Sequence, residues 1–155
     1  MTEPIPNLNL SNTMSIASKP HLILDFDSTL AIKRTNPPVH YPQIPELVKT
    51  LHETHHLYVA SFNPHAERVI ENWGLRQYFT DIRCGANFKW TGAYKEKHRI
   101  NLAKSSQILD MIPTAIEEEI ILYDDSKEKL TEVLLILPKV KTILVNPKTG
   151  FTGLS

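Results

Sequence analysis

The chain has 155 residues, of which 41% are hydrophobic and 22% charged, a composition that suits one globular domain and excludes a disordered polymer. Its 17 basic and 17 acidic residues cancel, so bulk charge predicts no attraction to nucleic acid or to an anionic membrane. The single cysteine, Cys84, excludes an internal disulfide framework, and no apolar run is long enough to span a bilayer. The first residues lack the pattern of a secretory signal, so we expect a soluble cytoplasmic protein.

Two regions differ in composition. Residues 1–19 are rich in Asn, Ser, Pro and Thr, which predicts a flexible leader. Residues 20–155 carry the apolar patterns and predict a single folded domain. Short apolar runs, typical of strands buried on both faces, lie at 21–24, 57–60, 120–123 and 143–145, with a further short strand at 82–84.

Segments of helical period separate these strands. Apolar residues recur there at intervals of three and four, as on the buried face of a helix. The expected helices cover 44–51, 66–73, about 95–109 and 127–137. Strands that alternate with helices predict an α/β protein of three layers, with a central, mostly parallel sheet of the Rossmann-like type.

Polar residues follow three of the predicted strands. In an open parallel sheet the ligand crevice lies at the carboxyl ends of the strands, where strand order reverses, so these residues are expected to face it. They are Asp25 and Asp27 after the first strand, Ser61 and Asn63 after the second, and Asp124 and Asp125 after the strand that ends at Tyr123.

A cluster of carboxylates repels itself at neutral pH unless pKa values rise or a cation binds. Oxygen ligands favour Mg²⁺, which readily takes phosphate oxygens as further ligands. We therefore expect Mg²⁺ as the cofactor and a phosphorylated substrate as the partner. The candidate metal ligands are Asp25, Asp27, Asp124 and Asp125.

The same residues predict a reaction. Asp25 would attack phosphorus and form an aspartyl-phosphate, while Asp27 would act as the general acid and then the general base. Ser61, Asn63 and Lys95 are the candidates for binding the phosphoryl group and stabilising its charge.

Each motif also has a purely structural interpretation. An isolated D-x-D is usually a solvated turn or a helix N-cap, and the Asp124-Asp125-Ser126 run is equally suited to capping the next helix. Ser61 and Lys95, taken singly, are ordinary structural residues. The functional interpretation depends on all of them occurring together.

In this order the residues resemble the haloacid dehalogenase superfamily of phosphotransferases. The matches are Asp25-Phe26-Asp27-Ser28-Thr29, then Ser61, Lys95, and Asp124-Asp125. Tyr41-Pro42-Gln43-Ile44-Pro45-Glu46, Lys95-Glu96-Lys97-His98 and Tyr123-Asp124-Asp125 are most similar to the small eukaryotic magnesium-dependent phosphatases. The resemblance implies that Asp25 binds the metal as well as attacking, that the Asp27 backbone carbonyl meets the metal, and that Thr29 stabilises the turn. It leaves Lys97 as the rival of Lys95.

The spacing between the motifs leaves no room for a separate cap domain, so the resemblance implies an open site suited to a phosphate on a protein, a sugar adduct or another exposed group. Phe62 and Lys129 depart from the family pattern near the crevice. Two alternatives remain. One is a phosphatase of nucleic-acid ends, a partner class that the neutral total charge does not favour, and it would use the basic residues Lys89, Lys95, Lys97, Arg99 and Lys104. The other is a non-catalytic phosphate-recognition module.

Overall fold

The computed structural model describes residues 19–85 and 103–155. Five strands form one sheet in which every neighbouring pair is parallel. Its order is β3-β2-β1-β4-β5. The strands are β1 (His21–Leu24), β2 (His56–Ser61), β3 (Asp81–Cys84), β4 (Ile120–Asp124) and β5 (Lys141–Leu144). The predicted parallel sheet is confirmed.

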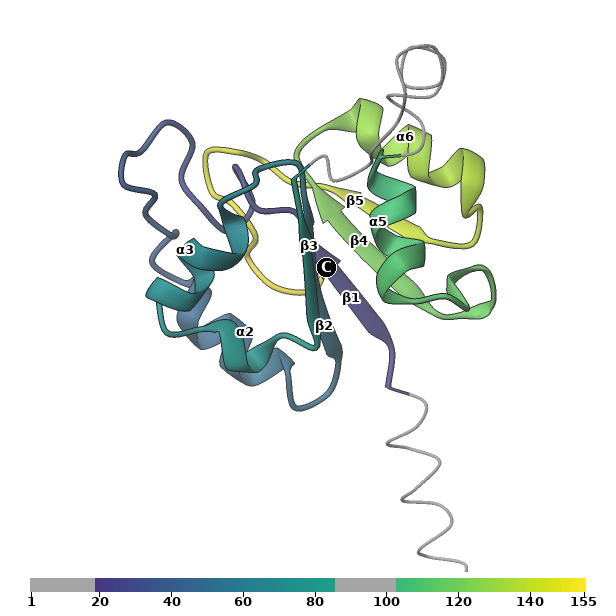
Figure 1. Cartoon of the computed structure of the whole chain (residues 1–155), viewed down its shortest axis with the longest axis horizontal. Coiled ribbons are helices and arrows are strands. Elements are labelled where there is room, and N and C mark those ends of the chain that lie inside the picture. Colours follow the sequence, from purple (N-terminus) through teal and green to yellow (C-terminus); the bar gives the residue numbers. More distant parts are fainter. Residues whose placement is uncertain (1–18, 86–102) are drawn as a thin grey trace, which may run out of the picture.

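Helices cover both faces of this sheet, as Figure 1 shows. Two pack on one face, α2 (Ile44–Leu51) and α3 (Ala66–Asn72), and two on the other, α5 (Ala103–Met111) and α6 (Lys127–Ile136). Short 3-10 turns, η1 (Arg76–Tyr78) and η2 (Ala115–Glu117), precede β3 and β4. All described elements belong to these three layers or connect them, as expected for a domain without a separate cap. No helix in the described ranges is both long enough and apolar enough to cross a membrane.

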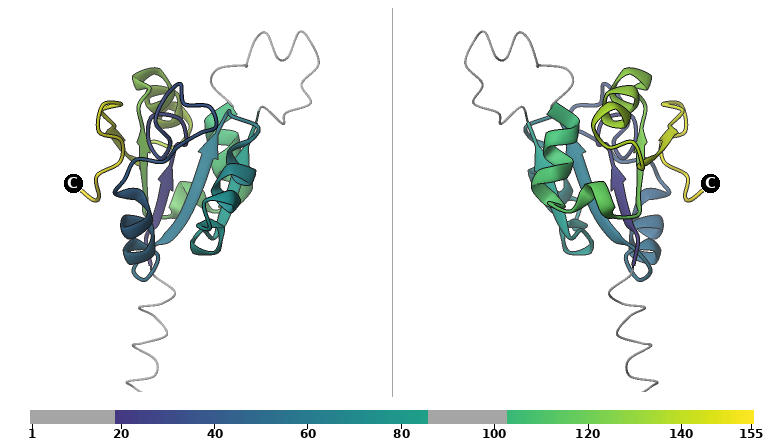
Figure 2. Two further views of the ribbon diagram at one scale, coloured as in Figure 1. Left: turned by 90° about the vertical axis from the view of Figure 1, so that its left-hand side faces the viewer. Right: turned by 90° about the vertical axis from the view of Figure 1, so that its right-hand side faces the viewer.

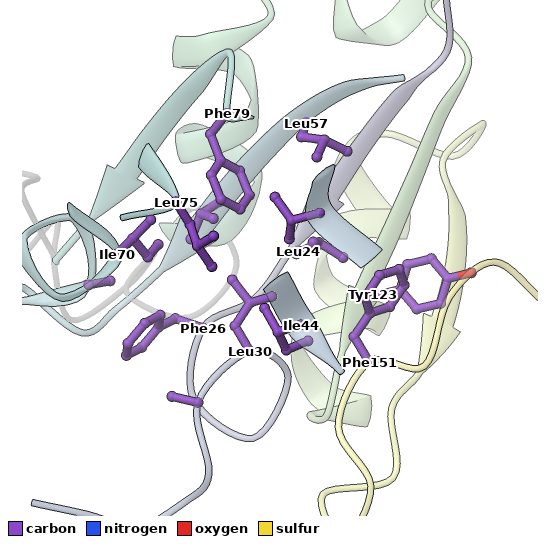
Figure 3. Close-up of a cluster of buried hydrophobic side chains, with 14 of the residues drawn as sticks. Leu24, Phe26, Leu30, Ile44, Leu57, Ile70, Leu75, Phe79, Tyr123 and Phe151 are labelled. Atoms are coloured by element: carbon purple, nitrogen blue, oxygen red, sulfur yellow. The ribbon is translucent and has the colours of Figure 1, made fainter. Parts of the chain in front are cut away.

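Alternate residues of the central strand serve the two apolar cores. Leu22 and Leu24 lie with residues of α2 and α3 in one core, whereas Ile23 lies with residues of α5 and α6 in the other. Successive side chains of a strand point to opposite faces, so a strand that is apolar throughout must be covered on both. Figure 3 shows the first core, which reaches from Phe79 to Phe151.

Most boundaries lie within one residue of the sequence predictions, and larger differences occur at two elements. The fifth strand runs over 141–144 rather than 143–145, because it begins with Lys141 and Thr142 at the edge of the sheet, where one side is open to solvent and polar residues are tolerated. The described part of α5 extends to Met111, beyond the expected end of this helix at 109. The predicted leader lies almost wholly outside the described residues, so it stays a prediction.

The C-terminal segment returns from the β5 edge to the loop that follows β1. It lies at the opposite edge of the molecule from α3 in both views of Figure 2. Gly150 turns it back with a positive φ of 70° against the ring of Tyr41. The Phe151 N–H then donates to the Thr29 carbonyl at 2.9 Å, and the Phe151 ring packs edge-on against Tyr123 at 4.7 Å between centroids. The last residues of the chain thereby support the loop after β1.

Candidate active site

The register of the sheet brings two of the acidic strand ends together. Leu24 pairs with Tyr123, and the Asp25 N–H donates to the Tyr123 carbonyl at 3.0 Å, so Asp25 and Asp124 end neighbouring strands. The chain runs outward from β1 to β2 and β3, and then crosses to β4 on the other side of β1. Strand order therefore reverses between Asp25 and Asp124, which is the place where α/β sheets bind their ligands.

A tight turn separates the two acids of the D-x-D motif. The buried Phe26 accepts backbone hydrogen bonds from Leu30 and Ala31 at 2.9 Å each, and Ser28 adopts a positive φ of 65°. Asp25 is consequently buried, with 3% of its surface exposed, whereas Asp27 is exposed at the surface. The motif places one carboxylate in the interior, at the strand ends, and one at the surface.

Three of the four predicted metal ligands form a compact group. One carboxylate oxygen from each of Asp25, Asp124 and Asp125 lies within 4.8 Å of the other two. The Asp27 side chain does not belong to this group. Both of its carboxylate oxygens lie 3.4 Å from the Asn63 amide nitrogen, which donates to them.

Lys104 occupies the place beside these carboxylates. Its Nζ atom lies 3.1 Å from Asp25 Oδ1 and 3.1 Å from Asp124 Oδ2, and it donates to the Ala60 carbonyl. The contact with Asp124 is close enough for an ion pair, but Asp124 Oδ2 accepts no aligned hydrogen bond in the described part of the chain. The side chain of Lys104 is completely buried, and within the described ranges Asp25 and Asp124 compensate its charge.

Lys104 is not one of the lysines that the sequence pattern predicts beside these carboxylates. Lys95 and Lys97, the lysines proposed from the sequence, lie outside the described residues, so their assignment stays a prediction. Lys104 opens a polar run, Lys104-Ser105-Ser106-Gln107, which has the composition of a solvated helix face. The available signal was its spacing, because Lys104 lies four residues before Ile108, on the same stripe of the helix.

Burial and charge shift the pKa values of this cluster. Burial raises the pKa of Asp25 to about 7, with a further upward contribution from Asp124, although Lys104 and Lys129 oppose it. Burial would lower the pKa of Lys104, but the adjacent carboxylates outweigh it and raise that pKa. Burial and then Asp124 raise the pKa of Asp125. The carboxylates therefore gain from any further cation that enters the group.

Ser61 lies at the end of the neighbouring strand with its hydroxyl inside the crevice wall. The side chain is buried, and its oxygen accepts a hydrogen bond from the Asn63 N–H at 3.1 Å. The Gln107 amide donates to the Ser61 carbonyl at 2.7 Å and to the Gly85 carbonyl at 3.1 Å, which joins the ends of β2 and β3 to α5. Among the described residues no acceptor binds the Ser61 hydroxyl hydrogen, so this hydrogen is available to a phosphoryl oxygen.

The cap of α6 is supplied mainly by Ser126. Its hydroxyl accepts from the Lys129 N–H at 3.3 Å, and Asp124 Oδ1 accepts from the Ser126 N–H at 2.9 Å. The Asp125 carboxylate lies in the acidic group. The structural and functional interpretations of the Asp-Asp-Ser run are thus compatible.

Thr29 is completely buried behind the motif. Its N–H donates to the Phe26 carbonyl at 3.2 Å and its own carbonyl accepts from Phe151, but its hydroxyl has no hydrogen-bond partner in the described ranges. Its backbone therefore takes part in the turn.

The acidic group has the chemistry that Mg²⁺ requires. All three donors are carboxylate oxygens, they come from two adjacent strand ends, and Asp124 Oδ2 lacks an aligned hydrogen bond. Asp25, Asp124 and Asp125 therefore fit a hard divalent cation.

Comparison with known proteins reveals similarity at the level of structure. Neither a family model nor a curated protein matches the sequence. A haloacid dehalogenase-like hydrolase of Streptococcus pneumoniae is 13% identical, with a TM-score of 0.63, over 88% of this chain and 89% of that chain. A candidate phosphatase of Clostridium difficile is 16% identical, with a TM-score of 0.63, over 86% of this chain and 88% of that chain.

A third similar structure is the N-terminal part of a Bacteroides fragilis protein that contains a phosphatase domain and is complexed with Mg. It is 16% identical, with a TM-score of 0.57, over 90% of this chain and 40% of that chain. At these identities the similarity concerns the fold. The chain therefore has the fold of the haloacid dehalogenase-like phosphatases.

Proposed function

We propose that this protein is a Mg²⁺-dependent phosphomonoesterase that works through an aspartyl-phosphate on Asp25. The observation that supports it most is the buried group of Asp25, Asp124 and Lys104 at the point where strand order reverses. A buried cluster of charges is costly to maintain, and its position is the one where this type of fold binds ligands. The fold shared with a haloacid dehalogenase-like hydrolase and with proteins described as phosphatases favours the same activity.

The first half of the proposed reaction is phosphoryl transfer to the protein. An oxygen of the Asp25 carboxylate attacks phosphorus while the bond from phosphorus to the leaving oxygen breaks. Asp27, at the mouth of the crevice, gives its proton to the leaving oxygen. Asn63 donates to the Asp27 carboxylate and keeps it directed toward the crevice.

The second half regenerates the enzyme. Asp27, now a carboxylate, takes a proton from a water molecule, and the water oxygen attacks phosphorus of the aspartyl-phosphate. The bond from phosphorus to Asp25 breaks and releases inorganic phosphate and the free carboxylate. Lys104 supplies positive charge beside Asp25, and the Ser61 hydroxyl donates to the phosphoryl group.

Asp25, Asp124 and Asp125 would hold Mg²⁺, as would the Asp27 backbone carbonyl that the family resemblance implies. When bound, the cation supplies charge neutralisation among the carboxylates and polarises a phosphoryl oxygen. The expected partner is a phosphorylated small molecule or a phosphoprotein, because the crevice mouth bears an exposed acid and no described element forms a cap.

Hydrolysis of p-nitrophenyl phosphate tests this proposal. We expect turnover that depends on Mg²⁺ and falls by at least about a thousandfold in Asp25→Asn, because the nucleophile is lost. Asp110→Asn is the matched control, since Asp110 is an exposed acid on α5 that pairs with Arg83 of β3. Circular dichroism should show that both variants are folded.

The intermediate has its own test. In Asp27→Asn, which lacks the base for the second step, acid quenching followed by intact-mass measurement should reveal one added phosphoryl group. Full activity of a folded Asp25→Asn would refute the assigned nucleophile. A folded wild type that binds phosphate and Mg²⁺ but hydrolyses no phosphomonoester would favour a recognition module.

A further inference from the structure

The mouth of the crevice carries an aromatic ring next to two lysines. Phe62, directly after Ser61, lies 5.4 Å from Lys104 Nζ and 4.3 Å from Lys129 Nζ, measured to the ring centroid. Both distances are within the range of attraction between a cation and an aromatic face. Phe62 and Lys129 are partly exposed, unlike Lys104, so this pair borders the opening of the site.

The two lysines differ in how their charge is compensated. Lys104 lies between Asp25 and Asp124 and is fully buried. Among the ion pairs of the described residues none involves Lys129. Lys129 nevertheless lies against the same Phe62 ring as Lys104, which in turn lies 3.1 Å from Asp25 Oδ1. It is therefore a cation beside the site that is free to bind an anion.

Lys129 is held in place by its neighbours rather than by a carboxylate. Its N–H donates to the Ser126 hydroxyl in the first turn of α6, and its ammonium group rests over the Phe62 ring. The nearest acid along the buried side of the helix is Glu132, whose two carboxylate oxygens accept no hydrogen bond within the described ranges. No ion pair between Glu132 and Lys129 occurs in the described residues.

We propose that Lys129, positioned by the Phe62 ring, binds a second anionic group of the substrate. The substrate class is then a phosphomonoester whose leaving group carries a carboxylate or another phosphate close to the scissile phosphate. The reacting phosphoryl group occupies the base of the crevice beside Asp25 and Lys104. The rest of the bound substrate extends outward past Lys129. A second negative charge on it would therefore lie close to the Lys129 ammonium group. This inference rests on the proposed function, because it assigns the substrate class of the same site.

Binding of non-hydrolysable phosphonates tests this inference without turnover. The probes are 3-phosphonopropionate and propylphosphonate, which differ chiefly in a terminal carboxylate, and the longer pair 5-phosphonopentanoate and pentylphosphonate. Titration calorimetry in the presence of Mg²⁺ should show that the wild type prefers the carboxylate member of at least one pair by about tenfold, as one charge-assisted contact provides.

Three variants assign that preference to the lysine. Lys129→Gln should lose the preference and keep its affinity for the alkyl phosphonates, whereas Lys129→Arg should keep both. Lys139→Gln is the control for net charge, because Lys139 is exposed beyond the far end of α6, and it should behave as the wild type. Phe62→Leu should weaken the preference, since the ring that positions the ammonium group is removed.

Two results would overturn the inference. One is a wild type without preference in either pair. The other is an equal loss of affinity for all four probes in Lys129→Gln, which would place Lys129 on the reacting phosphoryl group. Hydrolysis of propyl phosphate is measured separately. A preserved binding preference without any hydrolysis would contradict the proposed function and still support the anion subsite.

Discussion

The two ends of β1 both carry polar clusters, but they are built differently. At the amino end His21 contacts the Tyr58 hydroxyl at 2.8 Å and the Glu118 carboxylate at 3.3 Å, and its ring stacks on His56. At the carboxyl end Asp25 is buried with the charges of Asp124 and Lys104.

At the amino end Tyr58 is buried, but His21, His56 and Glu118 are partly exposed, so water solvates these charged groups and their contacts are worth little. The carboxyl-end groups are removed from water, and several buried oxygens nearby lack hydrogen-bond partners in the described chain. These are Thr29 Oγ1, Gln107 Oε1, Asp124 Oδ2 and both oxygens of Glu132. Unsatisfied buried groups are rare in proteins and call for an explanation such as a bound ion or a catalytic role. The comparison shows that the two ends of the strand differ in burial and in how fully their polar groups are hydrogen-bonded.

Removal of Lys104 should produce the largest effect on stability. Lys104→Met leaves two buried carboxylates without a cation, which should lower the free energy of unfolding by about 3–5 kcal/mol. Urea denaturation without metal measures this loss, with Lys139→Met as the control. Addition of Mg²⁺ should recover part of it, since a ligand of the native state stabilises that state. A loss below about 1 kcal/mol would show that the charged cluster at the carboxyl end contributes no more to the free energy of unfolding than the contacts at the amino end.

The affinity for Mg²⁺ should depend on pH. The pKa of Asp25 is raised to about 7, so the folded, metal-free protein keeps this proton at acidic pH, where Mg²⁺ must displace it. Affinity should therefore rise with pH up to about 7 and then level off. The raised pKa also means that the metal-free fold loses stability as pH rises from about 4 to 7.

Titration calorimetry in buffers of different ionisation enthalpy would count the protons released on Mg²⁺ binding. Asp25→Asn should release fewer protons than the wild type at pH 6. Equal release from the two proteins would mean that another group carries the raised pKa.

Glu132→Gln should stabilise the protein at alkaline pH. The pKa of this buried carboxyl is raised to about 7, chiefly by burial, so its ionised form destabilises the fold. The wild type should lose stability as pH rises from about 4.5 to 7, and the variant should not. We expect a gain on the order of 1–3 kcal/mol at pH 8 and little gain at pH 4.5, where both side chains are neutral. Thermal melts across this range, with the exposed Glu117→Gln as reference, would show parallel curves if the assignment were incorrect.

His21→Gln should have the smallest effect. It removes contacts with Tyr58 and Glu118 at the amino end of the sheet, which should reduce stability by about 1 kcal/mol or less. Hydrolysis of p-nitrophenyl phosphate should be unchanged, because the site lies at the other end of the strands. A loss of turnover as large as that of Asp25→Asn would show that the two ends do not differ in function.

The fold could be predicted from short-range patterns because its central strands are apolar on both faces. The run around Ile23 is apolar at successive positions, which indicates a strand buried on both faces. The same pattern recurs in β2 and β4, so all three strands were expected close to their observed positions. The edge strand β5 was less well defined, since Lys141 and Thr142 begin it and break the apolar pattern.

The site was predictable where backbone position decides the chemistry. Asp25, Asp124 and Asp125 follow strands, and parallel strands end at one edge. The position of Lys104 depends instead on the orientation of α5 against the sheet and on the carboxylates of Asp25 and Asp124, which compensate its charge. A pattern based on hydropathy places such a lysine in solvent. The different exposure of Asp25 and Asp27 likewise depends on the turn at Ser28, which the alternation of acids does not reveal.

The hydrogen bond from Phe151 to Thr29 ties the segment after β5 to the loop after β1. The loop after β1 is thus braced by a segment that follows the last strand of the sheet. The Ser155 N–H also reaches the Tyr123 hydroxyl at 3.1 Å, next to the strand end that carries Asp124. A fragment that stopped after β5 would keep all five strands and lose the brace. We therefore expect deletions and rigid fusions at this end to disturb the loop after β1, which begins at Asp25, before they disturb the sheet.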